Sequence, residues 1–372
     1  MAGSNSTRLA ALDGLRGWAA LSVVVYHMTR ETFGVIFPVF YTFPFSFLGN
    51  GTVAVAIFFA LSGYVLTLRR WHRTDNPHLP LTLVRRYLRL EIPVMAAVLI
   101  AWALMSLHLT PTAAANAVVH RDDWMGSFAN FEPDFVGALS FALVRTYWLV
   151  HDHNYGPFLW TMVIELWGSI CVLSISQTPR VFREAYSVLL LLVVLMLMVF
   201  PLAACLPAGA ILALAQRDGY LFCGEPGPLE SFVASAGLLA ALLGAAFEQM
   251  IVDSYLPAAI VGFLIFLCAA RSLPARAFLS APLSAWLGRI SFPVYLMQFA
   301  VIITVSAWMI VRVDAAGLLN PWTATLIAIV GTAAVLLAAQ LFLPVETFTL
   351  SFIKRIGRPR TPQPDAAPDP TA

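Results

Sequence analysis

The stretch Leu12-Asp13-Gly14-Leu15-Arg16-Gly17-Trp18, which continues through apolar residues to Tyr26-His27, places an acid, a base and an imidazole inside an apolar segment. Charges within a membrane span cost roughly 2.5 to 3.5 kcal/mol each on insertion scales, so they are functional candidates by default. Arg16 and His27 are about three helical turns apart, so both point to one side with an axial offset of roughly 16 Å. Asp13 can pair with Arg16 on that side. We therefore expect one polar helix face, which Gly17 lets other helices approach closely.

The composition of the whole chain is that of a multi-pass membrane protein. Of 372 residues, 60% are hydrophobic and only 11% are charged, whereas a soluble domain carries about 25% charged residues. The mean hydropathy is +0.80. A net charge of +2 gives no support for nucleic-acid binding. The four cysteines show no CxxC spacing, and His151 and His153 lack a third ligand at a diagnostic spacing, so we expect no metal site and no disulfide framework.

Apolar runs approaching the roughly 20 residues that a span needs predict an all-α, polytopic membrane helix bundle with about ten transmembrane helices. The ten runs are approximately 10–28, 49–68, 91–107, 157–176, 185–205, 206–222, 229–248, 255–271, 283–310 and 322–343. A further run at 136–150 is short and contains Arg145, so we interpret it as interfacial or re-entrant.

Arginine and lysine positions predict the orientation and the domain organisation. They cluster at 69–73, 85–89 and 354–360, in flanks that all face the cytoplasm if the N-terminus is cytoplasmic and the number of spans is even. We therefore expect both termini in the cytoplasm. The expected organisation is a cytoplasmic N-terminus at 1–9, one membrane domain at 10–350, and a tail at 351–372 that is first basic and then disordered.

Three further residues could carry chemistry, and two of them, Arg86 and Arg89, lie on the cytoplasmic side. Arg86 and Arg89 are neighbours at helical spacing, expected on a short amphipathic helix that enters the third span. Two guanidiniums on one face suit a phosphate or pyrophosphate; the alternative is a basic loop that sets topology and touches lipid headgroups. Glu165 lies in the middle of a span, where a carboxyl must pair or stay protonated, and it could pair structurally with an arginine.

Six short motifs occur in order along the chain. They are LDGLRG at 12–17 with His27, FFALSGY at 58–64, RYLR at 86–89 followed by Pro93, LWTMVIE at 159–165, GRISFPVYL at 288–296 and PVE at 344–346. In this order the sequence resembles the acyltransferase-3 family of integral membrane O-acyltransferases. One departure is Gln298, where the family commonly has a histidine. Gln298 can exchange hydrogen bonds but cannot carry a proton at neutral pH, which shifts any proton-transfer role onto His27.

The resemblance implies transfer of an acyl group, in the expected case acetyl, from acyl-CoA to an acceptor hydroxyl. It implies that His27 is the catalytic base or forms a transient acyl-histidine, with Asp13 holding Arg16 and Arg16 positioning the donor or the imidazole. Arg86 and Arg89 would clamp the CoA phosphates. Glu165 and Tyr295 complete the expected substrate and acyl-CoA site. Acyl-CoA is a co-substrate, and we expect no permanently bound cofactor.

The acceptor and the activity itself leave alternatives open. A small lipophilic metabolite or glycolipid that reaches the site from the lipid bilayer is preferred over a polymer. The expected context is secondary-metabolite biosynthesis, and the expected membrane is an endomembrane if the host is eukaryotic. A secondary transporter could use Asp13, Arg16, Glu165 and Arg217 to line a permeation path. A non-catalytic membrane protein built on the acyltransferase fold is the third possibility, to which Gln298 lends weight.

Overall fold

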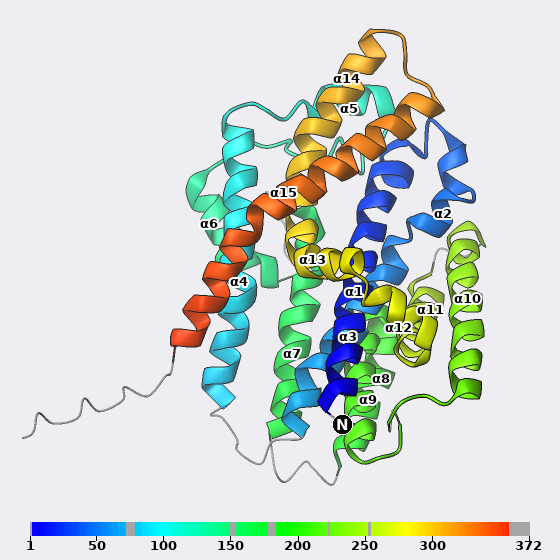
Figure 1. Cartoon of the computed structure of the whole chain (residues 1–372). Helices are drawn as coiled ribbons and strands as arrows, with labels where there is room; N and C mark the ends of the chain where they lie inside the picture. The colour runs from blue at the N-terminus through cyan, green and yellow to red at the C-terminus, as the bar shows by residue number, and fades with distance from the viewer. Residues whose placement is uncertain are drawn as a thin grey trace, which may run out of the picture.

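The structure is a computed structural model that describes residues 2–71, 79–148, 154–177, 184–221, 224–251 and 254–356. Within these ranges every regular element is helical, and the helices form one elongated bundle (Figure 1). This confirms the expected all-α fold. His151, His153 and the tail from residue 357 onward lie outside the described residues.

The longer helices form the body of the bundle. They are α1 (Ala2–Tyr26), α3 (Gly51–Trp71), α4 (Leu79–Ser106), α7 (Thr161–Gln177), α10 (Pro228–Ile251), α11 (Tyr255–Arg271), α13 (Pro282–Val301) and α15 (Pro321–Arg355). The shorter helices are α2 (Phe45–Leu48), α5 (Thr112–Val119), α6 (Phe135–Leu143), α8 (Ala185–Val199), α9 (Cys205–Arg217), α12 (Leu273–Leu279) and α14 (Ala307–Ala315).

The count of about ten spans is not confirmed. In the described part of the chain, six helical segments are long and apolar enough to cross a membrane, or seven if α11 and α12, bent by 93° at their junction, form one span. The expected spans 185–205 and 206–222 form helix α8 with 15 residues and helix α9 with 13, because Pro201 opens a 3-10 helix between them. Helix α1, which carries Asp13 and Arg16, is also outside this set. Residues 136–150 contain the short helix α6, in keeping with their length.

Helix α4 differs from the expectation of a separate amphipathic helix before the third span. It runs without a break from Leu79 to Ser106 and contains Pro93 in its interior. Arg86 and Arg89 therefore lie on the same rigid helix as the apolar span, so their positions relative to the bundle are set by α4 itself.

Helix α1 packs against α13 with their backbones in contact. A Cβ atom on Gly17 would lie 2.4 Å from the backbone nitrogen of Gly288, and one on Gly288 would lie 2.4 Å from the carbonyl oxygen of Asp13. Only glycine allows this approach, so the expectation that Gly17 brings another helix close is confirmed. The contact fixes the motif-bearing α1 against α13, which carries Tyr295 and Gln298.

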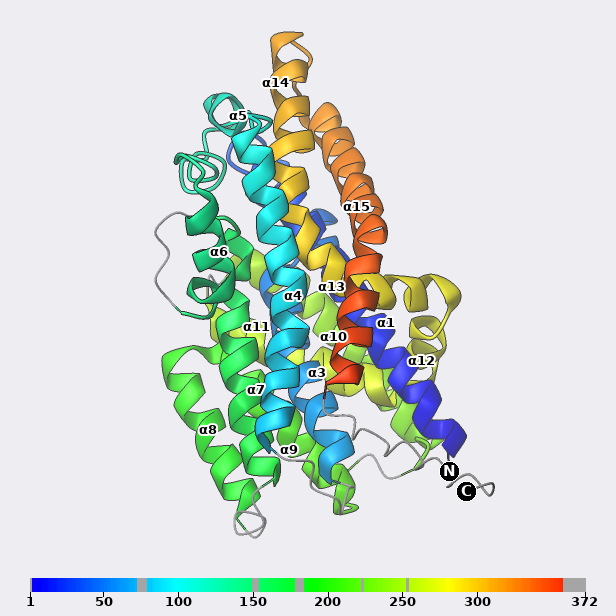
Figure 2. The ribbon, with the colours of Figure 1, turned by 90° about the vertical axis from the view of Figure 1, so that its left-hand side faces the viewer.

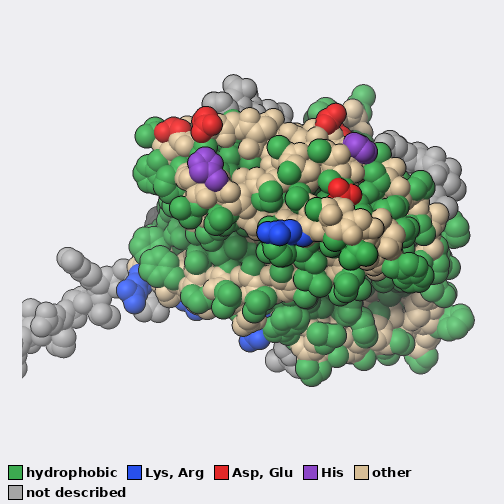
Figure 3. All heavy atoms as spheres, turned by 90° about the horizontal axis from the view of Figure 1, so that it is seen from above, with side chains coloured by type: hydrophobic (Ala, Val, Ile, Leu, Met, Phe, Trp, Pro, Cys, Tyr) green, Lys and Arg blue, Asp and Glu red, His purple; other side chains and the backbone are tan. Residues whose placement is uncertain are grey.

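Helix α1 begins and α15 ends at the same end of the bundle (Figures 1 and 2). This placement is compatible with an even number of crossings. Figure 3 views the opposite end, where acidic and histidine side chains lie scattered among apolar ones. Along the sides, large apolar side chains are exposed, as a lipid-facing surface requires; on α8 and α15 they include Leu190, Met198, Val199, Leu326, Ile329 and Leu341.

Candidate active site

A cavity of about 1160 Å³ inside the bundle brings together the residues that the sequence singled out. Its lining includes all seven expected site residues, namely Asp13, Arg16, His27, Arg86, Arg89, Glu165 and Tyr295. It also includes Glu31, Arg85, Trp124, Phe158, Arg289, Gln298 and Glu346. The cavity therefore connects the two ends of the polar face of α1, which the sequence had separated by three helical turns.

His27 lies where α1 changes its hydrogen-bonding pattern. The α-helix ends at Tyr26, and His27–Glu31 form a π-helical turn, a departure that often occurs at functional sites. The hydroxyl of Thr32 donates to the carbonyl oxygen of His27 at 2.7 Å, and the hydroxyl of Thr29 donates to that of Val25 at 2.6 Å. These bonds partner carbonyl oxygens at the end of α1 and at the start of the irregular turn.

Gln298 sets the tautomer of His27. The side-chain nitrogen of Gln298 donates to the carbonyl oxygen of Tyr295 at 3.1 Å, which leaves the amide oxygen to face Nδ1 of His27 at 3.0 Å. An amide oxygen only accepts, so Nδ1 carries the proton and donates. In the neutral imidazole, Nε2 is then the atom that can accept a proton, and it has no hydrogen bond in the described part of the chain.

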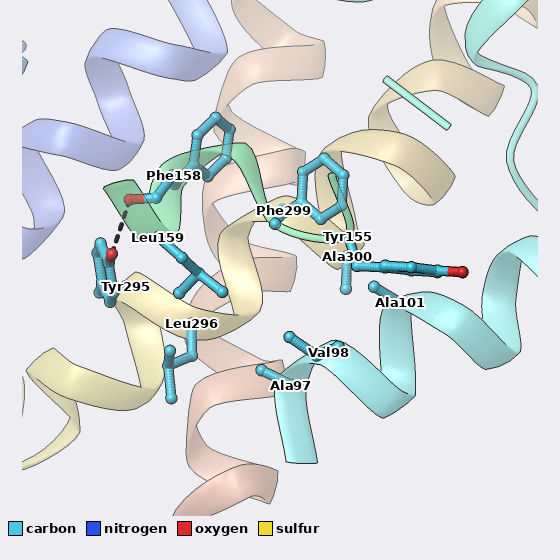
Figure 4. A pocket seen from close by; sticks show the side chains of 11 residues that line it. Ala97, Val98, Ala101, Tyr155, Phe158, Leu159, Tyr295, Leu296, Phe299 and Ala300 are labelled. Carbon is cyan, nitrogen blue, oxygen red and sulfur yellow. Dashed lines mark hydrogen bonds between the residues drawn. The ribbon is translucent and has the colours of Figure 1, made fainter. Parts of the chain in front are cut away.

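Aromatic rings surround the imidazole of His27. Phe158 stacks on it with ring centroids 4.3 Å apart, and Trp124 lies against it at 4.9 Å. The hydroxyl of Tyr295 donates to the carbonyl oxygen of Phe158 at 2.7 Å (Figure 4) and also bonds the hydroxyl of Thr161 at 2.8 Å. Tyr295 thus holds Phe158, and through it the imidazole. The apolar void beside these two residues measures only about 10 Å³, too small for a substrate group.

Arg86 and Glu165 form an ion pair between α4 and α7. Nη2 of Arg86 contacts Oε1 of Glu165, and the two side chains are only 11% and 15% exposed. The hydroxyl of Ser62 on α3 donates to the same carboxylate oxygen, while Nε of Arg86 donates to the hydroxyl of Ser169 at 3.1 Å. The structure therefore contains the pairing that the sequence left open for Glu165, and much of the Arg86 guanidinium is already engaged.

The remaining arginines of the lining give one part of the cavity a positive character. Arg16 lies 3.7 Å from Asp13, so the expected ion pair is present, although Asp13 is largely exposed. Arg89 is exposed to the cavity rather than packed. Arg85 and Arg289 are additional lining guanidiniums, and Arg85 also donates to the carbonyl oxygen of Ile356 at the end of α15.

The segment between α5 and α6 supplies site residues that the sequence reasoning missed. Arg121 pairs with Glu31 of the π-turn at 2.8 Å and with Asp123 at 2.9 Å. The hydrogen bond from Arg121 holds the pKa of the Asp123 carboxyl below its usual value. The neighbouring Trp124 is thereby held against His27. The signal for this segment in the sequence is the run of charges Arg121-Asp122-Asp123 before Trp124. An irregular segment has no periodicity, so the sequence could not indicate which of its side chains faces the cavity.

Fold and cavity together define a polytopic α-helical membrane protein with a polar internal site built around a histidine and several arginines. Within the described residues, no group of three or more histidine, cysteine or acidic side chains could hold a metal ion. Comparison with known sequences identifies the chain further. A family model described as an acyltransferase domain matches residues 9–342, and the chain belongs to this acyltransferase-3 family.

One curated relative shares part of the sequence. A peptidoglycan O-acetyltransferase, OatA, of Listeria monocytogenes serovar 1/2a is 30% identical over 121 residues, which are 32% of this chain and 16% of the relative. The match thus spans only a small part of the length of that protein. No solved structure matches the chain.

Proposed function

We propose that this protein is a membrane O-acyltransferase that moves an acyl group, acetyl in the simplest case, from acyl-CoA to an acceptor hydroxyl. The observation that supports this most is the single cavity lined both by His27, with Nε2 available, and by the arginines of α1, α4 and α13. The family of the chain and the printed activity of its relative support the same reaction class.

On this proposal, His27 acts as the general base. Nε2 takes the proton of the acceptor hydroxyl while the hydroxyl oxygen attacks the carbonyl carbon of the thioester. A new C–O ester bond forms, the C–S bond breaks, and the proton passes from the imidazole to the departing thiolate of CoA. In the variant mechanism, Nε2 itself attacks first and carries the acyl group before the hydroxyl receives it.

The arginines would bind the phosphate groups of the donor. Arg89 and Arg16 are the stronger candidates. Arg89 is exposed to the cavity, and the ion pair of Arg16 with Asp13 is long, at 3.7 Å, so its guanidinium is less engaged than that of Arg86. Arg86 is held by Glu165 and Ser169, so its main role on this proposal is to fix α4 against α7 and to add positive potential. The cavity extends from these arginines to His27, which gives a long pantetheine arm a continuous path.

The acceptor on this proposal is a hydroxyl of a small lipophilic metabolite, a glycolipid or a glycan. The relative is a peptidoglycan O-acetyltransferase by name, which supports including glycans. We further propose that both termini lie in the cytoplasm, where acyl-CoA is available, and that the membrane is an endomembrane if the host is eukaryotic. The shared end of α1 and α15 is compatible with this orientation.

The test measures the release of free CoA from acetyl-CoA by purified protein in detergent, with a panel of hydroxylated acceptors. We expect His27→Ala to lower kcat by roughly 10²- to 10⁴-fold, the usual range for a lost general base. We expect Arg89→Ala to raise the KM for acetyl-CoA by about tenfold, equivalent to one charge-assisted hydrogen bond. Arg312→Ala is the matched control, since Arg312 lies over Trp308 on α14 and does not line the cavity.

Undiminished CoA release by His27→Ala would overturn the catalytic assignment. Acyl-CoA binding without turnover by the wild-type protein would favour a non-catalytic role. Solute uptake by proteoliposomes, again without acyl transfer, would favour a transporter.

A further inference from the structure

Glu31 lines the cavity on the side of His27 that faces away from the arginines proposed to bind the donor. Arg16 precedes His27 on α1, whereas Glu31 follows it by four residues in the same continuous helical segment. The partner of Glu31 is Arg121, which follows the end of α5 by two residues. Helix α5 lies at the end of the bundle opposite to the start of α1 (Figure 2). The cavity therefore continues past His27, away from the region proposed for the CoA phosphates.

The carboxylate of Glu31 can accept a hydrogen bond from a molecule in the cavity. In the π-helical turn His27–Glu31 each hydrogen bond spans five residues, so a residue four positions on returns close to the same side. The Glu31 side chain is 18% exposed and borders the same cavity as the imidazole. Nη2 of Arg121 contacts one carboxylate oxygen, Oε2, at 2.8 Å. An ionised carboxylate has about four lone-pair sites, so it can accept from a further donor.

Two residues with hydroxyl groups border the same part of the cavity. Tyr26 immediately precedes His27, and its hydroxyl lies beside the Glu31 carboxylate. Thr52 also lines the cavity, and its neighbour Gly51 packs so closely on Tyr26 that an added Cβ atom would lie 2.8 Å from a ring carbon. One carboxylate and two hydroxyl groups beside the candidate base thus form a polar compartment, which suits an acceptor with more than one hydroxyl group.

The charges around this compartment favour a neutral hydrogen-bond donor. Arg121 is shared by the carboxylates of Glu31 and Asp123, at 2.8 Å and 2.9 Å. Two carboxylates and one guanidinium leave one net negative charge, which disfavours an anionic acceptor. The charge of Glu31 itself is balanced by the guanidinium that contacts it, so the carboxylate needs no second cation. A hydroxyl group of the acceptor meets both conditions.

We propose that Glu31 selects the acceptor by accepting a hydrogen bond from a second hydroxyl group, close to the one that is acylated at His27. This inference rests on the proposed acyltransferase function and names a polyhydroxylated molecule, such as one with a sugar ring, as the acceptor class. Glu31 takes no proton in the reaction, because the proton of the reacting hydroxyl passes to Nε2 of His27. The bond to Glu31 instead orients the acceptor so that its reacting oxygen faces the acyl carbon.

The kinetic test compares cyclohexanol with cis-cyclohexane-1,2-diol and cis-cyclohexane-1,3-diol as acceptors for acetyl-CoA. The wild type should favour the better diol over cyclohexanol in kcat/KM by about tenfold or more, equivalent to one hydrogen bond to a charged group. Glu31→Ala should remove most of this preference, mainly by raising the KM for the diol. Glu31→Gln keeps a neutral acceptor oxygen and should retain part of the preference, because a bond to a neutral group is weaker.

Asp123→Ala is the matched control. Asp123 is a second carboxylate bound to Arg121, but it is 75% exposed and lies outside the cavity lining. Its removal should leave the wild-type preference in place. A wild type that favours neither diol, or a Glu31→Ala variant that keeps the full preference, would overturn the proposal. The preference compares two acceptors on the same protein, so a general loss of stability does not change it.

A binding test does not depend on turnover. A maleimide reagent should label Thr52→Cys, and mass spectrometry measures the labelling at that residue. The better diol should protect it at about tenfold lower concentration than cyclohexanol, and adding Glu31→Ala should remove the difference. Equal protection by both alcohols would reject the role of Glu31. A wild-type protein that transfers no acyl group would reject the proposed function, and the labelling would still decide whether Glu31 binds the second hydroxyl.

Discussion

The Arg86–Glu165 ion pair offers a direct measure of how the charged part of the cavity is held together. Removing one partner of a buried ion pair costs about 3–5 kcal/mol, because the other charge is left without compensation. The two side chains are 11% and 15% exposed. They also border a cavity that water can enter, and Arg86 retains its bond to Ser169. We therefore expect Glu165→Gln to lower the free energy of unfolding by about 3 kcal/mol, the lower end of that range.

A double-mutant cycle isolates the pair from these other contacts. We expect Arg86→Gln to cost about as much as Glu165→Gln, and the double variant to cost about 2 kcal/mol less than the sum, within the range for residues in direct contact. The assay is unfolding in mixed micelles with increasing denaturing detergent, followed by circular dichroism. Ser169→Ala, which removes one hydrogen bond and no charge, should cost about 1 kcal/mol. A coupling energy below about 0.5 kcal/mol would refute the ion pair as a structural element.

Two further changes test the support of the site. Gln298→Leu removes the acceptor that keeps the proton on Nδ1 of His27, so kcat for acetyl transfer should fall by about tenfold with little change in KM; unchanged kcat would contradict this role. Gly17→Ala places a Cβ atom 2.4 Å from the backbone of Leu287 and should lower the stability by about 1–3 kcal/mol, measured as a lower Tm. Gly244→Ala meets nothing within 4 Å and should not lower it, so similar losses would show that the close helix contact is unimportant.

The polar face of the first helix could be predicted from the sequence because it depends only on helical geometry. Arg16 and His27 stand at a spacing that returns to the same side after three turns, and α1 is continuous as far as Tyr26. The two residues line one cavity as a result. The close approach at Gly17 followed from the same reasoning, although the partner, Gly288, could be identified only from the tertiary structure.

The number of spans could not be predicted in this way, because apolar runs do not reveal where a helix breaks. The expected spans 185–205 and 206–222 form helices of only 15 and 13 residues, because a 3-10 helix begins at Pro201, and the chain bends by 93° between α11 and α12. Helix α4 shows the opposite error, since a polar segment and an apolar span form one helix from Leu79 onward.

Pairings between distant segments also lay beyond the sequence. Glu165 was recognised as needing a partner, but the choice of Arg86 follows from the packing of α4 against α7. Trp124 belongs to an irregular segment whose direction is set by the bond of Arg121 to Glu31. Such contacts depend on the whole bundle, and neither hydropathy nor spacing encodes them.

The environment of His27 distinguishes an acyltransferase site from a permeation path lined by the same charges. A path for ions or polar solutes needs groups that can hydrate or exchange partners along its length. His27 instead lies among the rings of Trp124 and Phe158, and Nδ1 is bound to a glutamine that is itself held by the backbone. This arrangement fixes one imidazole nitrogen and leaves the other to face the cavity, which suits directed proton transfer at a single point.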